Sequence, residues 1–520
     1  MKQEQITATS MLPEPSAQNN RRARKAGRKI VSASTIQKAW LVLLAALAMT
    51  VLEGAFRKWV FPSGGALKYL LYFSKDIIFA LVLLFPKRSL PSPAMKVFGN
   101  WLIPGCVLLG AGAVLSSPHG LNPVGALLTA RACVILPVIA WLAVPRLAGL
   151  PLRWVIWLLV AFTVLNFALG VEQNRLPSDH ILNRYSETGM DIVAMESGVR
   201  ATGTFSYITG MTIISSVGIW AGLSLMSLAK KQWQRIGAWP ALAAGFGCGL
   251  ASISRGPIVV GVAMVAGWMV CSRDGLSALF RSLVTGAFCL VIASGLGVAP
   301  IFSELGAGVM QRQANGGDTF NNRAFGQFGE MFDALEMAPL GHGFGTEQIG
   351  GQYYATGQGG FNHFESPLPR LVMETGVLGL IGYLVICAGA LLALQRAKRE
   401  AANVGAKAML LATQFFLLPM FYGNVIFNHT ASAFVWIIFA AVLAAAETNE
   451  KAETLKTESR NQETKHGRLT AEDGSKNGKR RRPRLGRAIF SATAKRGEEN
   501  AETPKPENGK EQPGREPLNR

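Results

Sequence analysis

The sequence predicts an all-α fold, a polytopic bundle of about 12 transmembrane helices, and three observations lead to this prediction. Hydrophobic residues make up 49% of the 520 residues and charged residues only 16%, whereas a soluble chain carries about 25% charge. The mean hydropathy is +0.26. The apolar residues gather in runs close to the length of about 20 residues that crosses the hydrocarbon of a bilayer. This composition indicates a membrane-embedded protein and argues against a string of soluble domains.

Twelve apolar runs divide the predicted transmembrane domain, residues 39–447. Their signal is weakest around residues 236–271, where glycine and serine dilute it. The runs cover 39–56, 68–85, 98–116, 123–144, 152–170, 205–228, 236–253, 257–271, 279–299, 367–394, 405–422 and 430–447.

Polar, basic tails flank this domain. Residues 1–38 hold eight Lys and Arg against two Glu, and residues 448–520 hold eighteen against twelve Asp and Glu. The second tail has almost no large apolar side chains, so it is expected to be disordered. Because more than thirty polar residues precede the first run, that run is expected to be a signal anchor and not a cleaved signal peptide.

The charges between the runs predict the orientation. Lys and Arg collect in short loops on the cytoplasmic side of membrane proteins. With the N-terminus inside, every inside connection is basic, whereas the outside connections near 117–122 and 423–429 contain no Lys or Arg. An even number of spans then places both tails in the cytoplasm. The inside cations are Lys87, Arg88, Lys96, Arg146, Arg153, Lys230, Lys231, Arg235, Arg273, Arg281, Arg396, Lys398 and Arg399.

Two outside segments, about 171–204 and 300–366, are too long to be simple turns. The second lies between spans 9 and 10 and contains a stretch, Arg323 to Ala338, whose apolar residues fall at helical spacing. Long loops in a compact domain are usually functional or disordered. The aromatic content of the second loop favours order.

Several classes of ligand are not expected. The pI near 9.9 reflects tails that would attract anionic lipid, and the densest basic run, Lys479 to Arg487, lacks the aromatics that stack nucleic-acid bases. The six cysteines form no CxxC pair and the six histidines no HExxH motif, so neither metal nor disulfides are predicted. The bilayer is the expected partner, and no nucleic acid is expected.

Four arginines on the predicted outside face are candidates for binding phosphate: Arg200, Arg255, Arg323 and Arg370. The planar fork of a guanidinium suits phosphate oxygens and stays charged at any working pH. Alternatively, each arginine pairs with a loop carboxylate or a lipid headgroup. Within the runs, Lys75 and Asp76 are expected to form an internal structural pair, and the role of Arg131 stays open.

Short motifs follow one another along this profile. Arg200-Ala-Thr-Gly-Thr-Phe205 precedes Ser254-Arg255-Gly256, and the late loop then reads Arg323, Pro339-Leu-Gly-His-Gly-Phe-Gly345, His363 and Glu374-Thr-Gly-Val-Leu-Gly379. In this order the motifs resemble those of the bacterial O-antigen ligase and O-antigen polymerase superfamily. Glu53-Gly-Ala-Phe-Arg-Lys-Trp59 resembles the opening of one subgroup. The resemblance covers residues 39–447 and leaves both tails outside.

The resemblance implies a multi-pass protein of the bacterial inner membrane whose late outside loop is periplasmic. It implies a metal-independent, inverting glycosyltransferase without a cofactor, which moves a glycan from undecaprenyl diphosphate to a hydroxyl of a glycan or of lipid A core, with other polysaccharide-assembly proteins as partners. Arg200, Arg255 and Arg323 would bind the diphosphate. His363 or Glu365 would remove the acceptor proton: the family's histidine stands about nine residues before the Glu of Glu-x-Gly, and Glu365 occupies that position while His363 stands eleven before Glu374.

Polymerase and ligase activities both fit these motifs. The variant histidine spacing and the unusual opening favour polymerisation of a surface or secreted polysaccharide. A transporter of a small solute or a lipid-linked glycan is the alternative from another class, since twelve spans also suit a transporter. Transporters commonly show paired half-repeats, and no duplication is visible between residues 39–228 and 236–447.

Overall fold

A computed structural model describes most of the predicted transmembrane domain. The described residues all belong to one compact unit. The tail 448–520, the predicted span 279–299 apart from its last residue, and loop residues 349–363 lie outside them. Described are residues 33–62, 66–88, 91–149, 151–185, 194–195, 198–229, 232–271, 299–315, 319–348, 364, 366–423 and 425–447.

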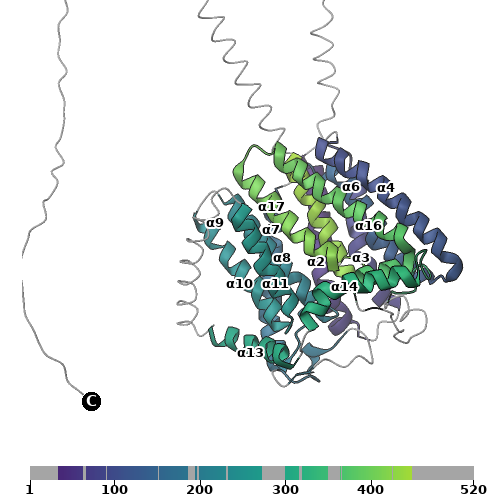
Figure 1. Cartoon of the computed structure of the whole chain (residues 1–520). Coiled ribbons are helices and arrows are strands. Elements are labelled where there is room, and N and C mark those ends of the chain that lie inside the picture. Colours follow the sequence, from purple (N-terminus) through teal and green to yellow (C-terminus); the bar gives the residue numbers. More distant parts are fainter. Residues whose placement is uncertain are drawn as a thin grey trace, which may run out of the picture. The chain divides into compact units, whose positions relative to one another are not determined.

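Helices dominate the described residues. Many of the long helices run with similar axes, and α14 crosses the bundle near one end (Figure 1). Two-residue strands β1 (Ala194–Met195) and β2 (Gly198–Val199) pair antiparallel ahead of α8. The helices are α2 (Ala33–Ala55) with the π-helical turn η1 (Phe56–Val60), α3 (Ala66–Leu81), α4 (Pro93–Ser116), α5 (Pro123–Ala130), the π-helical turn η4 (Arg131–Ile135), α6 (Leu136–Leu147), α7 (Leu152–Arg175), α8 (Ile208–Leu228), α9 (Gln232–Ile236), α10 (Ala238–Ala251), α11 (Arg255–Cys271), α13 (Ala299–Asn315), α14 (Thr319–Met337), α16 (Pro367–Glu400), α17 (Val404–Gly423) and a last helix (His429–Glu447).

Eight helices of the described residues are long and apolar enough to cross a membrane, as expected for a multi-pass membrane protein. Three predicted spans form shorter helices: α3 has 16 residues, α10 has 14 and α11 has 17. At 1.5 Å per residue these reach about 21–26 Å, less than the hydrocarbon thickness of about 30 Å. Hydropathy reports composition and not helix length, and the turn at Ser252–Ser254 ends α10 before α11 begins.

Small residues let α4 and α16 approach closely. A Cβ atom added at Gly112 would lie 2.4 Å from the Thr375 carbonyl oxygen and 2.8 Å from the Gly379 nitrogen, and one at Gly382 would lie 2.6 Å from the Gly105 carbonyl oxygen. Glycines at helix contacts are typical of membrane bundles, where close packing drives association. This contact fixes α16, whose first turns carry the Glu374–Gly379 motif.

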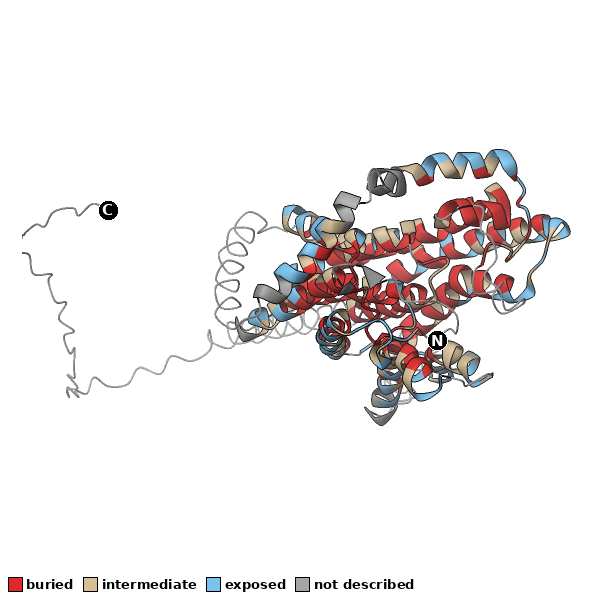
Figure 2. Cartoon of the chain, turned by 90° about the horizontal axis from the view of Figure 1, so that it is seen from below, coloured by how far each residue is buried: buried red, intermediate tan, exposed pale blue. Residues whose placement is uncertain are grey.

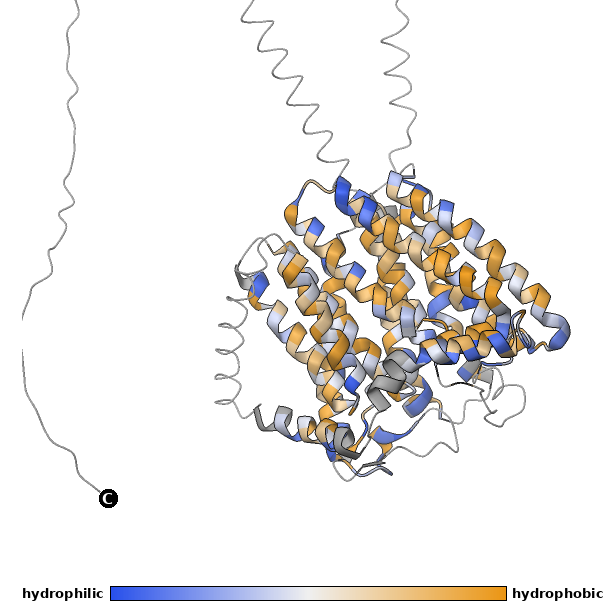
Figure 3. Cartoon of the chain, viewed as in Figure 1, coloured by the Kyte–Doolittle hydropathy of each residue, from blue (hydrophilic) through white to orange (hydrophobic). Residues whose placement is uncertain are grey.

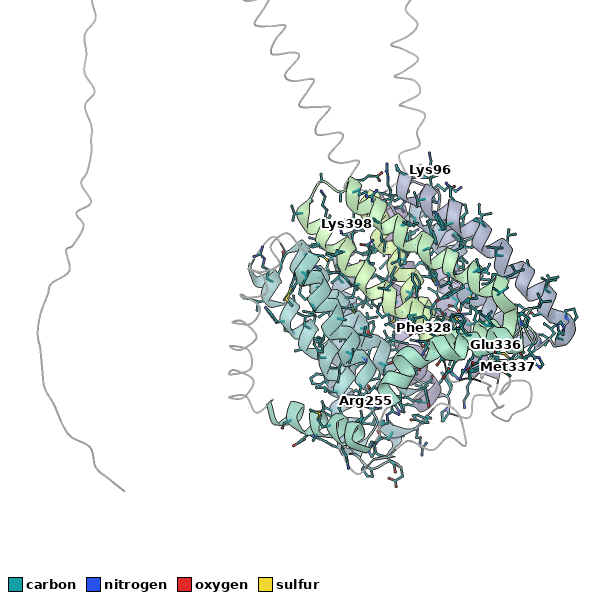
Figure 4. All side chains as sticks on the ribbon, viewed as in Figure 1. Lys96, Arg255, Phe328, Glu336, Met337 and Lys398 are labelled. Atoms are coloured by element: carbon teal, nitrogen blue, oxygen red, sulfur yellow. The ribbon has the colours of Figure 1, made fainter. Side chains whose placement is uncertain are left out.

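The two ends of the bundle differ in charge. We call the end that contains Arg88, Ser92, Arg146 and Ala397 the basic end. There the Arg88 backbone nitrogen donates to the Pro145 carbonyl (2.8 Å), and residues near Ser92, Ala397 and Glu447 line a small cavity. Lys96 and Lys398 lie at this end, and Arg255 and Glu336 lie toward the other (Figure 4). We call that other end, which contains the turns after α2, α4 and α10, the loop end.

Apolar side chains cover the outside of the bundle as well as its core. Hydrophobic residues extend along the long helices, with hydrophilic residues more frequent toward their ends (Figure 3). Buried residues fill the interior between the helices (Figure 2). On α4, Val107 and Val114 are 66% and 71% exposed. Apolar surface of this extent marks contact with a membrane.

Candidate functional site

Two segments far apart in the sequence meet at the loop end. The turn that precedes α8, Arg200–Ser206, lies against the turn between α10 and α11, Ser252–Arg255. The Arg200 guanidinium donates from Nε to the Ser252 carbonyl (3.1 Å) and from Nη2 to the Ser254 hydroxyl (3.0 Å). The Ala201 backbone nitrogen donates to the Ala251 carbonyl (3.1 Å). The structure therefore places Arg200 against the turn that leads to Arg255, which begins α11 and is half-buried.

The turn that leads to Arg255 is strained. Ile253 has φ +49°, and it is the only described residue other than glycine with a positive φ. A β-branched side chain disfavours this conformation strongly, and strain of this kind concentrates at functional sites. The Ile253 nitrogen donates to the Leu250 carbonyl (2.8 Å). Strain at this turn supports a functional role for the Ser254–Arg255 pair.

Buried amides of α7 fix the other turn. Gln173 Oε1 accepts hydrogen bonds from the backbone nitrogens of Thr202 (3.0 Å) and Gly203 (2.7 Å), and Asn166 Oδ1 accepts one from the Thr204 nitrogen (2.8 Å). Gly203 has φ +59°, a conformation that glycine adopts at little cost. These contacts give the backbone beside Arg200 a single arrangement. Gln173 and Asn166 have no signature in the sequence, because isolated amides within or just after an apolar run form no motif.

Two cationic side chains of η1 form hydrogen bonds with the same turn. Lys58 Nζ donates to the Thr202 hydroxyl (2.9 Å) and the Gly203 carbonyl (2.7 Å). Arg57 Nη1 donates to the Ser206 hydroxyl (3.3 Å) and forms a salt bridge with Glu53 (2.9 Å). In the sequence these residues contribute only to the resemblance of the Glu53–Trp59 opening. Their distance along the chain from residue 200 concealed the contact.

A second group of charges continues this network. Lys75 of α3 forms a salt bridge with Glu53, and Asp76 accepts two hydrogen bonds, 2.5 and 2.7 Å long, from Arg131 of η4. Arg131 Nη1 also lies 2.8 Å from His429 Nδ1. We call Glu53, Arg57, Lys58, Lys75, Asp76, Arg131 and His429 the interior ionic cluster.

The predicted pairing of Lys75 with Asp76 is wrong. Each residue instead pairs with a charge on another helix, Glu53 and Arg131 respectively. Successive residues of an α-helix point about 100° apart, so neighbours in the sequence do not face each other. The two residues consequently connect α3 to α2 and to η4. This arrangement also accounts for Arg131, whose role the sequence left open.

Three cations of the cluster lie on π-helical turns. Arg57 and Lys58 belong to η1, and Arg131 begins η4. Single π-helical turns are rare and occur frequently at functional sites. Both turns lie in the loop-end half of their helices, and η1 contacts the turn that carries Arg200. The interior ionic cluster is thus continuous with the Arg200–Arg255 region.

The glycine-rich motif Pro339–Gly345 fits a break in α16. Gly376 departs from helical geometry with φ +64° and ψ −165°. The break frees backbone groups that the loop then satisfies: the Val377 nitrogen donates to the Pro339 carbonyl (2.9 Å), and the His342 nitrogen donates to the Met373 carbonyl (2.6 Å). Farther along the loop, a Cβ on Gly345 would lie 2.1 Å from the Ala126 nitrogen. This motif packs the loop onto α16 and α5.

Glu374 anchors the same loop from α16. Its fully buried carboxylate accepts hydrogen bonds from the Thr129 hydroxyl (2.6 Å) and the Glu347 nitrogen (3.2 Å). Gln348 Nε2 donates to the Thr129 hydroxyl (2.9 Å). The Glu374–Gly379 motif therefore has a positioning role in the described structure.

The structure describes the remaining candidate residues to different extents. Arg323 lies on α14, and its side chain is outside the described residues, as are His363 and Glu365 entirely. Arg370 is buried at the start of α16, donates from Nε to the Phe364 carbonyl (2.5 Å) and lies 5.7 Å from the centroid of the Phe427 ring. In the described part of the chain, no group of three or more His, Cys, Asp or Glu side chains is arranged to hold a metal ion.

Comparison with known proteins adds nothing to the class of protein that the structure defines. The described structure is that of a multi-pass helical membrane protein, with Arg200 and the turn before Arg255 in contact at the loop end. No family model and no curated protein matches the chain. The resemblance to the O-antigen ligase and polymerase superfamily therefore stays a prediction from the sequence motifs.

Proposed function

We propose that this protein is a membrane glycosyltransferase, which moves a glycan from undecaprenyl diphosphate to an acceptor hydroxyl at the periplasmic face in O-antigen or exopolysaccharide polymerisation or ligation. The main observation in support of the proposal is that Arg200 forms hydrogen bonds with the Ser252–Arg255 turn at the loop end. The charge of the opposite, basic end supports an orientation in which that end faces the cytoplasm. The loop end would then face the periplasm of a bacterial inner membrane.

Arginine side chains are suited to catalyse this reaction. A diphosphate leaves readily once its developing negative charge is stabilised, and preorganised cationic donors supply this stabilisation without a metal. The hydrogen bonds of Arg200 to the strained turn fix its guanidinium before substrate binds, so little reorganisation is needed during the reaction. Arg323 remains a third proposed ligand of the diphosphate.

Acceptor activation is assigned to the segment that contains His363 and Glu365. A histidine has an ordinary pKa of about 6.5 and accepts a proton near neutral pH. A glutamate at the same place would serve if burial raised its pKa. Attack opposite the leaving diphosphate gives inversion at the anomeric carbon.

The Arg255→Ala and Arg200→Ala variants are expected to reduce glycan transfer about a hundredfold or more, since each removes charge stabilisation from the leaving group. Surface glycan on gels, with membrane insertion verified, measures the effect in cells. Arg153→Ala is the matched control, because Arg153 is an exposed arginine in the first turn of α7, at the basic end. Normal glycan from both loop-end variants would contradict the proposal. Arg200→Lys tests whether the forked geometry of the guanidinium is needed.

Lipid-linked intermediates in a deletion strain distinguish the two acceptors. Accumulated single repeat units would assign polymerisation, whereas accumulated full-length chains would assign ligation to lipid A core. The motifs favour polymerisation.

A transporter is the second candidate, and one feature of the fold favours it. Broken helices and buried ionisable residues mark the transport paths of many membrane carriers, and this chain has both in the α16 break at Gly376 and the interior ionic cluster. Flux measurements on reconstituted vesicles distinguish the two candidate functions. Flux of a solute or a lipid-linked glycan without formation of a glycosidic bond would assign transport.

A further inference from the structure

Helix α14 is long enough to cross a bilayer but is too polar to do so. Its 19 residues extend about 29 Å, close to the hydrocarbon thickness of about 30 Å. It contains Glu330, Asp333 and Glu336, and it is not among the eight helices of the described residues that are apolar enough to span. It instead crosses the bundle near the loop end (Figure 1). Because the long helices span the bilayer, a helix that crosses them runs along the membrane plane.

The described part of α14 buries one side and exposes apolar side chains beside it. Gln327 and Ala334 are buried. Phe328 and Phe332, one turn apart, are 46% and 61% exposed, and Leu335 is partly buried against the core. At about 100° per residue, Phe328, Phe332 and Leu335 fall within a sector of about 60°. We call these three residues the apolar flank.

The flank on the other side of the buried face is acidic. It contains the exposed Asp333 and the partly buried Glu330, and the exposed Glu336 lies between the two flanks. Met337, the last residue of α14, is an apolar residue on this side. Charged carboxylates are costly to remove from water, so the acidic flank is expected to face the aqueous phase. Separation of an apolar from a charged flank is typical of a helix that lies between water and lipid.

The apolar flank continues a lipid-facing surface of α17. The ring centroids of Phe328 and Tyr422 lie 5.7 Å apart. Leu418, one turn before Tyr422 on α17, is 56% exposed. The 20 residues of α17 extend about 30 Å, which matches the hydrocarbon thickness, and Tyr422 lies in its last turn. The contact therefore places α14 at the level where α17 leaves the hydrocarbon.

We infer that α14 binds the surface of the bilayer, with its apolar flank at the boundary between headgroups and acyl chains. Apolar side chains of such helices enter this boundary by about 5–10 Å, and the polar side stays in water. Arg323 lies on the same helix, so the bilayer would hold the backbone of this candidate residue at the level of lipid phosphates. That consequence rests on the proposed function, whereas the membrane contact rests on the apolar flank and its continuity with α17.

Site-specific photocrosslinking of the full chain tests this contact. The photoreactive amino acid p-benzoyl-phenylalanine in place of Phe332 should form adducts with lipid in vesicles of phosphatidylethanolamine and phosphatidylglycerol, detected by the mass of the intact protein. The same amino acid in place of Asp333 is the matched control, because Asp333 is also exposed but lies on the acidic flank. A helix with its side chains is about 10–12 Å wide, so the Phe332 position should give about fivefold more lipid adduct than the Asp333 position. Leu418 provides a lipid-facing reference.

Three outcomes would overturn the inference. The first is an equal lipid yield from the Phe332 and Asp333 positions, or a low yield from Phe332 while the Leu418 reference reacts. The second is a crosslinked dimer, which would assign the apolar flank to a second copy of the chain. The third is an adduct with another segment of the same chain, which would assign the flank to the protein's own loops.

A second labelled position keeps the test decisive. If the label at Phe332 prevents insertion, the label at Phe328 of the same flank answers the same question, with the same expected excess over Asp333. Because contact with lipid is read without substrate or turnover, failure of the proposed function would show separately, as normal glycan from the Arg200→Ala and Arg255→Ala strains.

Discussion

The Gly376→Ala variant is expected to lose about 4 kcal/mol of folding stability, the sum of a backbone and a packing cost. At φ +64° and ψ −165°, Gly376 occupies a region that is essentially restricted to glycine. An added Cβ would also lie 2.5 Å from the carbonyl oxygen of Pro339, which is backbone and not a flexible side chain. Relief of that contact requires the loop to leave α16, and the Val377 to Pro339 hydrogen bond is then lost.

The unfolding midpoint and the yield of monodisperse protein measure this effect. Gly110→Ala provides the matched control, because Gly110 lies within α4 and an added Cβ there meets nothing within 4 Å. Alanine within a helix is more favourable than glycine by roughly 0.5–1 kcal/mol, so the control should be neutral or slightly stabilising. A Gly376→Ala protein as stable as the control would mean that α16 tolerates a regular helix at this position.

Sequence patterns identified the parts of this fold that depend on composition and local chemistry. Long apolar runs indicated a multi-pass helical protein, since the bilayer imposes that length on any spanning helix. The runs that became α3, α10 and α11 form helices shorter than a full span, because hydropathy does not show where a helix stops. Arg200 and Arg255 were recognised because they are arginines on the predicted outside face, where the positive-inside rule predicts none, and the structure places their turns together.

Contacts between distant helices could not be predicted in the same way. Lys58 contacts Thr202, 144 residues along the chain, and Thr129 contacts Glu374, 245 residues along the chain. Neither pair has a signature in spacing, since their contact depends on how whole helices pack. The π-helical geometry of η1 and η4 is also a product of tertiary structure, because local propensity favours the ordinary α-helix. The sequence therefore indicated which residues are costly but not their partners.

The Glu53→Gln variant is expected to lose about 3–5 kcal/mol of folding stability, the usual effect of removing one partner from a buried ion pair. Glu53 is 4% exposed and is the shared counter-charge of Arg57 and Lys75. Its neutralisation removes the counter-charge that these two cations share. The unfolding midpoint of the purified protein measures the loss. Glu400→Gln is the control, because Glu400 pairs with the half-exposed Arg396 at the basic end, and such pairs contribute only about 0–1 kcal/mol.

A second substitution distinguishes loss of charge balance from loss of packing. Lys75→Met in the Glu53→Gln background removes the cation that Glu53 neutralised and replaces it with an apolar side chain of similar length. If uncompensated charge is the cause, the double variant should be more stable than Glu53→Gln alone, since hydrophobic replacement of a buried ion pair is often neutral. If shape is the cause, the two losses should add. Recovery of stability would establish that charge balance limits how many cations the bundle interior holds.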